Sequence, residues 1–454
     1  MTYEELIAKK AFNRIDAGFV PASLNANLKS HQHAIVNWAC QRGRAAIFAD
    51  TGLGKSFMQL EWAHQVSQHT SKPVIIFAPL AVGKQTQGEA AKFGITSKAK
   101  YMREFDGVHR IVVTNYEMID NFNPSDFAGI VLDESSILKG QSGAYRKKLT
   151  EFACKIPYRL SCTATPSPND FMELGTQAEF LGIMSQAEML AMFFTHDGSE
   201  TQKWRLKGHG ASKFWDWLAM WSVVISSPAD LGYDGKEYEL PPLTIHEVIL
   251  PSDNSNTLIA DVAQGLSAAR DAKRGSIVRR VKACADMINA TDDSWLIWGE
   301  LNAETDMLSS MINDCVQVQG SDKLETKESR LMGFTDGKHK RLISKASICG
   351  FGMNWQHSSK MAFVGPTYSF EQFYQAVRRQ WRFGQTNPVD VYVFMTEEET
   401  GIHSTMLAKM ENDKIMRREM INVMGDAMQK EITGATKTIS NYAAIKPARM
   451  PTFI

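Results

Sequence analysis

Short apolar runs alternate with polar or helical stretches in the first part of the chain. The runs cover residues 45–48, 74–77, 111–114, 130–132 and 158–161. This alternation is typical of parallel strands joined by crossover helices. Because ligands gather at the carboxyl ends of the strands in an open α/β sheet, we expect the chemistry just after these runs.

The same rhythm returns in the second half of the chain and predicts a second parallel sheet. The later runs cover residues 295–298, 315–318, 342–344, 361–364 and 391–394. The predicted fold class is therefore α/β, with two parallel-sheet domains in tandem and a helical insertion between them. The predicted boundaries are 1–24 for an N-terminal accessory helix, 25–169 for the first domain, 170–250 for the insertion and linker, 251–430 for the second domain and 431–454 for a tail.

The insertion is rich in methionine and aromatic residues. Phe214, Trp217 and Trp221 have the spacing of one helix face. Core packing is one interpretation of this face, and a platform on which nucleic-acid bases stack is the other. Residues 238–250 then read as a proline-stiffened linker followed by a strand.

Length and net charge limit the number of domains and the ways in which the protein can bind a charged partner. The 454 residues exceed what one core accommodates, and 50 basic and 50 acidic residues leave no net charge. Any polyanion must therefore be held by local patches. Two basic clusters are candidates for phosphate contact, and solvated surface is the alternative for both: Arg270, Lys273, Arg274, Arg279, Arg280 and Lys282, and then Lys338, Lys340 and Arg341.

Cysteine usage and hydropathy indicate the compartment. The six cysteines are scattered without metal-binding spacing, so we expect neither a disulfide nor a zinc site. No apolar run reaches the length of a membrane span, and the first residues lack the pattern of a signal peptide. We expect a cytoplasmic protein.

Residues 49–56, Ala-Asp-Thr-Gly-Leu-Gly-Lys-Ser, have the pattern of a phosphate-binding loop. Gly52 and Gly54 allow the backbone N–H groups to approach phosphate oxygens, and Lys55 would reach the same phosphates. Ser56 would place its hydroxyl on Mg²⁺. The alternative is a glycine-rich turn that caps an ordinary helix. The phosphate loop is favoured because it requires a strand before it and a helix after it, and the strand-like run and the helical segment 57–66 supply both.

Two acids follow an apolar run about eighty residues later. Asp133 and Glu134 directly follow the run 130–132, which is the Walker B arrangement. Asp133 would hold Mg²⁺ and Glu134 would orient the attacking water. Two acids in a surface turn would be the alternative if the phosphate loop were absent.

Three further segments contain candidate functional residues, but their sequence patterns are less specific than the two above. The amide of Gln32 could pair with adenine, although a surface glutamine has the same sequence appearance. The hydroxyl-rich segment 161–166 could link the nucleotide state to a second ligand, or be a plain turn. Gln375, Arg379 and Arg382 have the spacing of one helix face, on which the arginines would contact phosphate oxygens; a basic surface is the alternative.

These segments occur in the order of the motifs of superfamily 2 helicases, and their form most resembles the Swi/Snf type. Gln32 and the segments 49–56, 78–80, 114–117, 133–136 and 161–166 resemble motifs Q, I, Ia, Ib, II and III, while 298–299, 350–355 and 375–385 resemble motifs IV, V and VI. The resemblance runs from about residue 28 to residue 394. One departure is Ser135-Ser136, where the family usually has Ala-His. The family's histidine connects motifs II and III, so that connection is not predicted here.

The resemblance implies two RecA-like domains that close on ATP, and it assigns roles to individual residues. The implied catalytic residues are Lys55, Asp133, Glu134, Arg379 and Arg382, with Arg382 as the arginine finger. The implied ATP contacts are Gln32, Thr51, Gly52, Leu53, Gly54, Lys55, Ser56, Gly352, Asn354 and Gln375, and the implied Mg²⁺ ligands are Ser56 and Asp133. The implied DNA contacts are Pro79, Thr114, Asn115, Thr163 and Gly299.

The resemblance also implies an activity: translocation on double-stranded DNA without strand separation, driven by hydrolysis of Mg-ATP. We expect a compact, monomeric motor, similar to phage and bacterial members, that acts with an unidentified protein partner or alone. One alternative is a strand-separating DNA or RNA helicase of the same superfamily, which the Swi/Snf form of motifs I and VI disfavours. The other is an ATP-gated DNA-binding clamp, which the presence of Glu134 and Arg382 disfavours.

Overall fold

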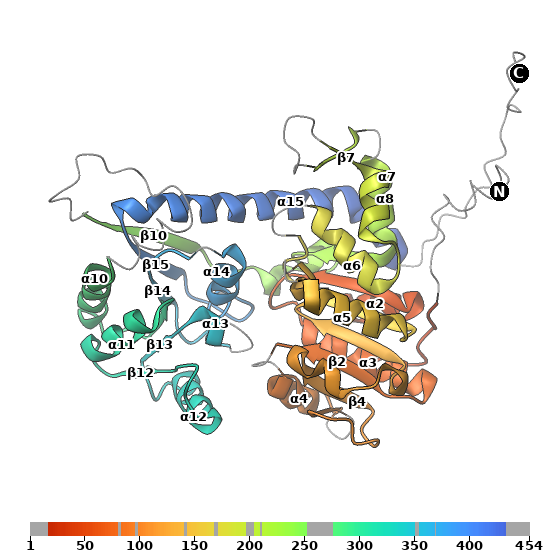
Figure 1. The fold of residues 1–454 in the computed structure, drawn as a ribbon, viewed down its shortest axis with the longest axis horizontal. Helices are drawn as coiled ribbons and strands as arrows, with labels where there is room; N and C mark the ends of the chain where they lie inside the picture. The colour runs from red at the N-terminus through yellow and green to blue at the C-terminus, as the bar shows by residue number, and fades with distance from the viewer. Residues whose placement is uncertain are drawn as a thin grey trace, which may run out of the picture.

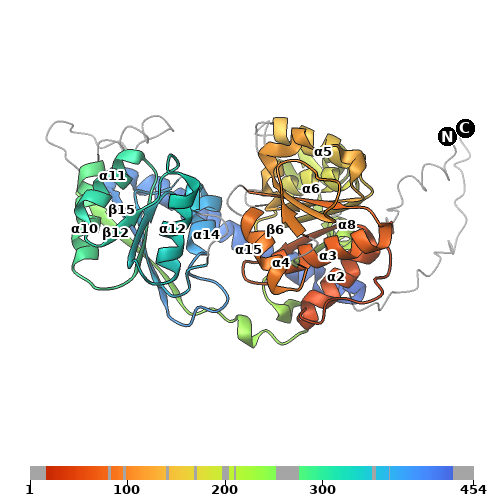
Figure 2. The same ribbon diagram turned by 90° about the horizontal axis from the view of Figure 1, so that it is seen from below.

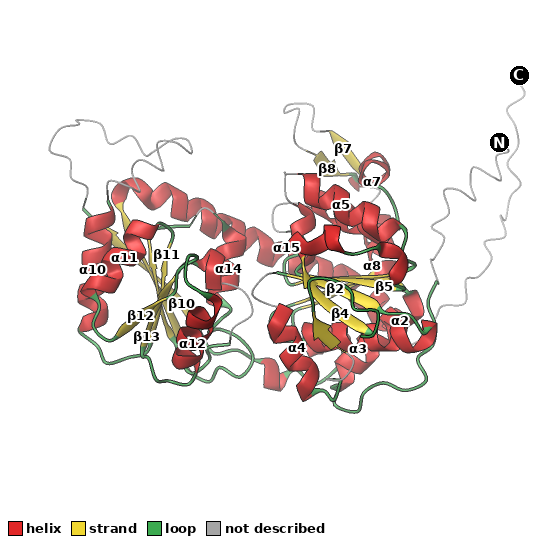
Figure 3. Cartoon of the chain, turned by 60° about the horizontal axis from the view of Figure 1, so that its bottom comes forward, coloured by secondary structure: helices red, strands yellow, loops and turns green. Residues whose placement is uncertain are grey.

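Two parallel-sheet domains lie side by side in the computed structural model (Figures 1 and 3). The structure describes residues 17–79, 83–95, 99–139, 143–167, 171–196, 204–208, 211–251, 276–349, 354–367 and 369–432. Residues 1–16 of the predicted accessory helix and 433–454 of the predicted tail lie outside these residues, as do 252–275 and Gly352. Helices alternate with the strands of both parallel sheets, which confirms the predicted α/β fold class.

The first sheet is parallel throughout and has the strand order β3-β4-β2-β5-β6-β1-β9. Its strands are β1 (Arg44–Ala49), β2 (Val74–Ala78), β3 (Ala99–Tyr101), β4 (Ile111–Asn115), β5 (Gly129–Asp133), β6 (Tyr158–Thr163) and β9 (Ser222–Ile225). Five of them confirm the five apolar runs, which are nearly continuous because helices cover both faces of the sheet. The covering helices include α2 (Ser30–Arg42), α3 (Lys55–Thr70), α4 (Gly83–Lys92) and α5 (Gly143–Cys154).

The segment expected to be a separate insertion differs from that expectation, because it packs into the first domain. Its elements are α6 (Leu174–Leu181), α7 (Gln186–Phe193), the antiparallel hairpin β7 (Phe194–His196) and β8 (Trp204–Leu206), and α8 (Ala211–Trp221), followed by β9. Strand β9 pairs in parallel with β1, and the apolar side chains of α6 and α8 belong to the first core. Phe214, Trp217 and Trp221 are buried there, which confirms core packing rather than base stacking for these three rings.

The second sheet is also parallel, with the order β10-β15-β14-β11-β13-β12. Its strands are β10 (Leu243–Leu250), β11 (Trp295–Gly299), β12 (Cys315–Gln317), β13 (Arg341–Ser344), β14 (Lys360–Val364) and β15 (Val389–Thr396). The helices around it are α10 (Ile277–Asn289), α11 (Asn302–Met311), α12 (Leu324–Thr335), α13 (Ala346–Cys349) and α14 (Phe370–Val377). The strand expected in the linker is β10, and it joins the sheet at its edge along the whole of β15.

Two connections join the domains. The first is the linker that runs from β9 through the short helices η6 (Pro228–Leu231) and η7 (Lys236–Tyr238) to β10 (Figure 2). The second is α15 (Thr400–Ile432), a helix of 33 residues that crosses both domains (Figure 1). Met406 near its start is buried in the second core, whereas Met420, Met424 and Met428 are buried in the first. The C-terminal half of α15 therefore packs into the first domain, although the sequence had assigned it to the second.

The basic clusters are only partly available to a ligand. Arg280 is fully buried and forms ion pairs with Glu304 (2.6 Å) and Glu399 (2.5 Å). The guanidinium of Arg341 donates to backbone carbonyls, among them that of Thr291 at 2.6 Å. Phosphate contact is therefore wrong for these two arginines, which hold the second domain together. None of the helices within the described ranges is long and apolar enough to cross a membrane.

Candidate active site

The phosphate loop lies between β1 and α3, the context that the sequence predicts. Gly52 and Gly54 have left-handed φ angles of 94° and 82°. A Cβ atom on Gly54 would lie 2.3 Å from Nε2 of Gln32, and one on Gly52 would lie 2.9 Å from Cβ of Phe383. Both positions therefore require glycine for conformation and for space.

Lys55 begins α3 and points back into the loop. Its Nζ donates to the backbone carbonyls of Ala49 (2.8 Å) and Asp50 (3.2 Å). Burial lowers the pKa of Lys55, and the nearby carboxylates of Glu134, Asp50 and Asp133 oppose that shift. The ammonium thus lies between the loop and the acids at the end of β5, where a phosphate chain could replace the carbonyls as its partner.

Asp133 and Glu134 stand at the carboxyl end of β5. Oδ1 of the buried Asp133 accepts a hydrogen bond from Nε2 of Gln59 in α3 (2.8 Å). Burial, followed by the adjacent charge of Glu134, raises the pKa of Asp133 to about 7. Glu134 has a left-handed φ of 54°, which is rare outside glycine and turns the chain sharply out of the strand. The predicted acid pair is therefore assembled beside the phosphate loop.

Motifs II and III are connected here without the family's histidine. The Thr163 hydroxyl, at the end of β6, donates to Oε2 of Glu134 (3.3 Å) and accepts from the backbone N–H of Thr165 (3.1 Å). Nε2 of Gln177 in α6 also donates to the backbone carbonyl of Ser135 (2.9 Å). Thr163 of motif III thus makes the connection to motif II, and Gln177 holds Ser135 from α6.

The donor set fits Mg²⁺. Asp133 offers carboxylate oxygens, and Ser56 offers a hydroxyl in the first turn of α3, the helix whose Gln59 bonds Asp133. A Mg²⁺ ion that takes most of its ligands from phosphates and water needs no larger protein cage. Among the described residues, no group of three or more His, Cys, Asp or Glu side chains is placed to hold a metal.

Gln32 supports the phosphate loop in this structure. Its Oε1 accepts from the backbone N–H of Lys29 (3.0 Å), and its Nε2 donates to the backbone carbonyl of Leu53 (3.0 Å). Both ends of the amide are thereby engaged, and the side chain is buried. The adenine contact stays a prediction that requires Gln32 to exchange these partners.

The motif VI segment differs from the expected helix. Helix α14 ends at Val377, so Gln375 is helical while Arg379 and Arg382 lie in the turns that follow. Tertiary bonds end the helix: the carbonyl of Arg379 accepts from the backbone N–H of Trp355 (2.9 Å), and the indole of Trp381 donates to the carbonyl of Pro241 (2.7 Å). The expectation of one helix face is therefore wrong for the two arginines.

The arginines nevertheless have ordered partners. Nη2 of Arg379 donates to Oε1 of Gln375 (3.3 Å), and Arg382 donates to Oδ1 of Asn354. Burial lowers the pKa of Arg382 to about 10, so it stays charged at neutral pH, and Glu89 of the first domain opposes the shift. Four of the predicted second-domain residues are therefore hydrogen-bonded in two pairs, and the charge of Glu89 acts on Arg382 across the domain boundary.

Sequence reasoning missed a direct contact between the phosphate loop and the second domain. Asp50 forms ion pairs with Arg378 and with Arg417 (3.7 Å) and accepts a hydrogen bond from Tyr374. The doubled arginine at 378–379 hinted at an additional role in motif VI. No local pattern marked Arg417, which lies on α15.

The predicted DNA contacts all lie at carboxyl ends of strands but do not form one exposed surface. Pro79 follows β2, and the side chains of Thr114 and Asn115 at the end of β4 are fully buried. Nδ2 of Asn115 donates to the hydroxyl of Tyr101 (2.8 Å). Thr163 is engaged with Glu134 as described above.

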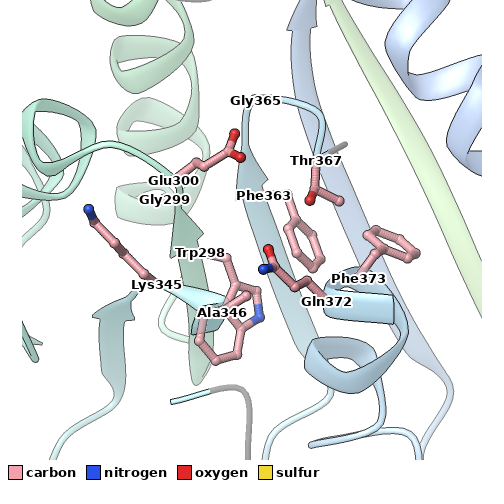
Figure 4. A pocket seen from close by; sticks show the side chains of 10 residues that line it. All are labelled: Trp298, Gly299, Glu300, Lys345, Ala346, Phe363, Gly365, Thr367, Gln372 and Phe373. Atoms are coloured by element: carbon pink, nitrogen blue, oxygen red, sulfur yellow. The ribbon is translucent and has the colours of Figure 1, made fainter. Parts of the chain in front are cut away.

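Gly299 lies at the end of β11 in the second domain, where it lines a pocket. The pocket opens between the ends of β11 and β14 and is also lined by Trp298, Glu300, Lys345, Ala346, Phe363, Gly365, Thr367, Gln372 and Phe373 (Figure 4). DNA contact stays a prediction for all five residues, and this pocket is the place where Gly299 would make it.

Comparisons with known proteins agree with the motifs. Residues 25–168 match the family model of the type III restriction enzyme, res subunit. Protein p41 of Acyrthosiphon pisum secondary endosymbiont phage 1 is 24% identical over 442 residues, which cover 82% of this chain and 93% of that protein. The chromatin-remodeling ATPase INO80 of Gibberella zeae is 28% identical over 214 residues; the match covers 40% of this chain but only 11% of that much longer protein.

A solved structure shares the fold. A fragment assigned as the HsdR subunit of a type I restriction enzyme from Vibrio vulnificus YJ016 superposes with a TM-score of 0.56 at 14% identity, covering 90% of this chain and 70% of that one. The two parallel sheets are thus RecA-like domains. The order of the motifs, the fold and the relatives together make the chain similar to the helicase-like ATPases of superfamily 2, most of all to their Swi/Snf type.

Proposed function

We propose that the chain is an ATP-dependent motor that translocates on double-stranded DNA without separating its strands. The proposal rests on one observation: the phosphate loop of the first domain contacts motif VI of the second. Gly52 of the loop packs against Phe383, which follows Arg382 in motif VI. The acid pair and Lys55 belong to one domain and the arginines to the other, so a nucleotide bound at the loop would lie between them. The similarity to chromatin-remodeling ATPases supports the choice of duplex DNA.

Each group has a distinct part in the proposed hydrolysis. Lys55 would leave its two carbonyl partners and bind the β- and γ-phosphates. Mg²⁺ held by Ser56 and Asp133 would offset charge on the phosphates. Glu134 would orient the attacking water, and its bond from Thr163 would fix the carboxylate while it does so. Arg382, with Arg379 beside it, would stabilise the charge that develops during transfer.

Hydrolysis would move the motor because the site is assembled from two domains. ATP would favour the closed arrangement and its loss would favour an open one. With DNA bound across both domains, each cycle of hydrolysis would move the protein along the DNA by about one nucleotide. We further propose that the motor acts as a monomer. Its setting would be the cytoplasm of a bacterial cell or phage-infected host, and the phage relative supports this setting.

ATP turnover in the presence of different polymers tests this function. Turnover should rise several-fold with duplex DNA compared with single-stranded DNA, RNA or no polymer. A triplex-forming strand should be displaced while a plain forked duplex stays paired. Equal stimulation by RNA or efficient unwinding of the fork would instead support a strand-separating helicase. DNA binding should also weaken steeply as the salt concentration rises, because contacts with the DNA phosphates supply most of the affinity.

A further inference from the structure

Two side chains of the second domain and one side chain of α15 converge on one carboxylate of the phosphate loop. Tyr374 on α14 donates a hydrogen bond to Oδ1 of Asp50, and Arg378 at the end of α14 forms an ion pair with Oδ2. Arg417 on α15 brings Nη1 to 3.7 Å from Oδ1. We call Tyr374, Arg378 and Arg417 the clasp.

Arg378 of the clasp is buried, Tyr374 and Arg417 are partly buried, and both arginines are held by neighbouring side chains. The exposed fraction of the side chain is 3% for Arg378 and 12% for Arg417. Oδ2 of Asp413 accepts from Nε of Arg417 (2.8 Å), and the guanidinium of Arg378 lies over the ring of Trp381 at 4.8 Å. Few rotamers remain to be lost when the clasp meets Asp50, so the contact is preorganised.

Asp50 transmits this contact to the phosphate loop. Its Oδ1 accepts from the backbone N–H of Thr51 (2.6 Å), and its backbone carbonyl accepts from Nζ of Lys55 (3.2 Å). Burial alone would raise the pKa of Asp50, but Arg378 and Arg417 hold it well below its ordinary range. The carboxylate is therefore charged at neutral pH, and loss of the clasp would leave a largely buried charge without its ion pairs.

We propose that the clasp sets the conformation of the phosphate loop through Asp50, and thereby makes ATP affinity depend on the docking of the second domain. Tyr374, Arg378 and Arg417 are positioning residues in this scheme, because their polar groups are directed at Asp50 and act on the nucleotide only through it. The inference rests on the proposed function in one respect: the loop must be the ATP site. It gives Arg378 a role different from that of the neighbouring Arg379 and Arg382.

A double-mutant cycle on the full-length chain tests the coupling. The variants are Asp50→Asn, Arg378→Gln and the combination of both, and the readout is the affinity for a fluorescent ATP analogue without DNA. Arg378→Gln should weaken affinity about tenfold, because it leaves Asp50 charged and buried. The combined variant should bind better than Arg378→Gln alone, because no unpaired charge remains.

Two further variants separate positioning from general damage to the fold. Arg378→Lys should recover part of the affinity, since an ammonium can form one of the ion-pair contacts. Arg146→Gln is the matched control: it breaks the 2.6 Å ion pair with Glu179 inside the first domain and should leave affinity unchanged. In steady-state assays, Arg378→Gln should raise KM for ATP more than it lowers kcat.

The outcomes distinguish this inference from the proposed function. Wild-type affinity in Arg378→Gln, or fully additive losses in the combined variant, would overturn the clasp while leaving a DNA-stimulated ATPase intact. Conversely, a wild-type protein that binds ATP but ignores duplex DNA would defeat the proposed motor, and the cycle in nucleotide affinity would still report on the clasp.

Discussion

The hydroxyl of Thr163 donates a hydrogen bond to Oε2 of Glu134 across 3.3 Å. The bond joins the carboxyl ends of two neighbouring strands, β6 and β5. Because Thr163 also accepts from the backbone of Thr165, the orientation of its hydroxyl is fixed from both sides. The acid predicted to orient water is thus held by a residue that the sequence had assigned to DNA contact.

Glu134→Gln should leave ATP binding intact and remove turnover. The amide oxygen can still accept from Thr163, so the local structure is retained while the group that orients water is lost, a change worth roughly 10² to 10⁴ in rate. Nucleotide affinity and ATPase activity should be measured together. The variant should hold DNA tightly in ATP without displacing a triplex strand. If it displaces the strand as well as the wild type does, hydrolysis does not drive movement and the clamp alternative gains.

Thr163→Val tests the bond to Glu134 itself. Valine keeps the β-branched shape in a buried strand end but removes the hydroxyl, so Glu134 loses a donor and the N–H of Thr165 loses an acceptor. We expect turnover to fall about tenfold with ATP affinity nearly unchanged, which corresponds to the loss of roughly one hydrogen bond to a charged group. Thr163→Ser retains the hydroxyl and is the control. Normal turnover in Thr163→Val would show that the bond has no part in hydrolysis.

Arg382→Ala should abolish detectable DNA-stimulated turnover. By comparison with arginine fingers in other nucleotide hydrolases, the loss should be about 10³ to 10⁵ in rate, with a smaller effect on ATP binding. Arg382→Lys should not restore activity, because an ammonium lacks the planar fork. Lys55→Ala should weaken nucleotide binding as well as turnover. Wild-type hydrolysis by Arg382→Ala would mean that motif VI is only a basic surface, and the two-domain site would fail.

Met424→Ala tests the packing of α15 in the first domain. The side chain is fully buried among first-core residues, so its truncation should lower the free energy of unfolding by about 2 to 5 kcal/mol. Val423 is the adjacent residue and is 51% exposed, so Val423→Ala should have almost no effect. Denaturant titration of both variants makes the comparison. Equal stability of the two would indicate that α15 does not complete the first core.

The sequence predicted local features well because their causes are local. The strand runs, the glycines of the phosphate loop and the acids after β5 each depend on residues close to them in the chain. The partners of Asp50 could not be found in this way: Tyr374 lies 324 positions away, and Arg417 is farther still. Likewise, helical periodicity showed that α8 has an apolar face but not which core it would join. The end of α14 was misjudged because tertiary bonds of Arg379 and Trp381 override its local helical spacing.

The position of α15 affects how the protein folds during its synthesis on the ribosome. Strands β1 to β9 are translated first, yet the methionines that pack beside β9 and α8 are translated about two hundred residues later. The backbone N–H of Val224, for example, contacts Sδ of Met428 at 3.3 Å. Domains usually complete folding in the order of their synthesis. Here the nascent first domain keeps an apolar face uncovered until the second has been made, so the two must mature together.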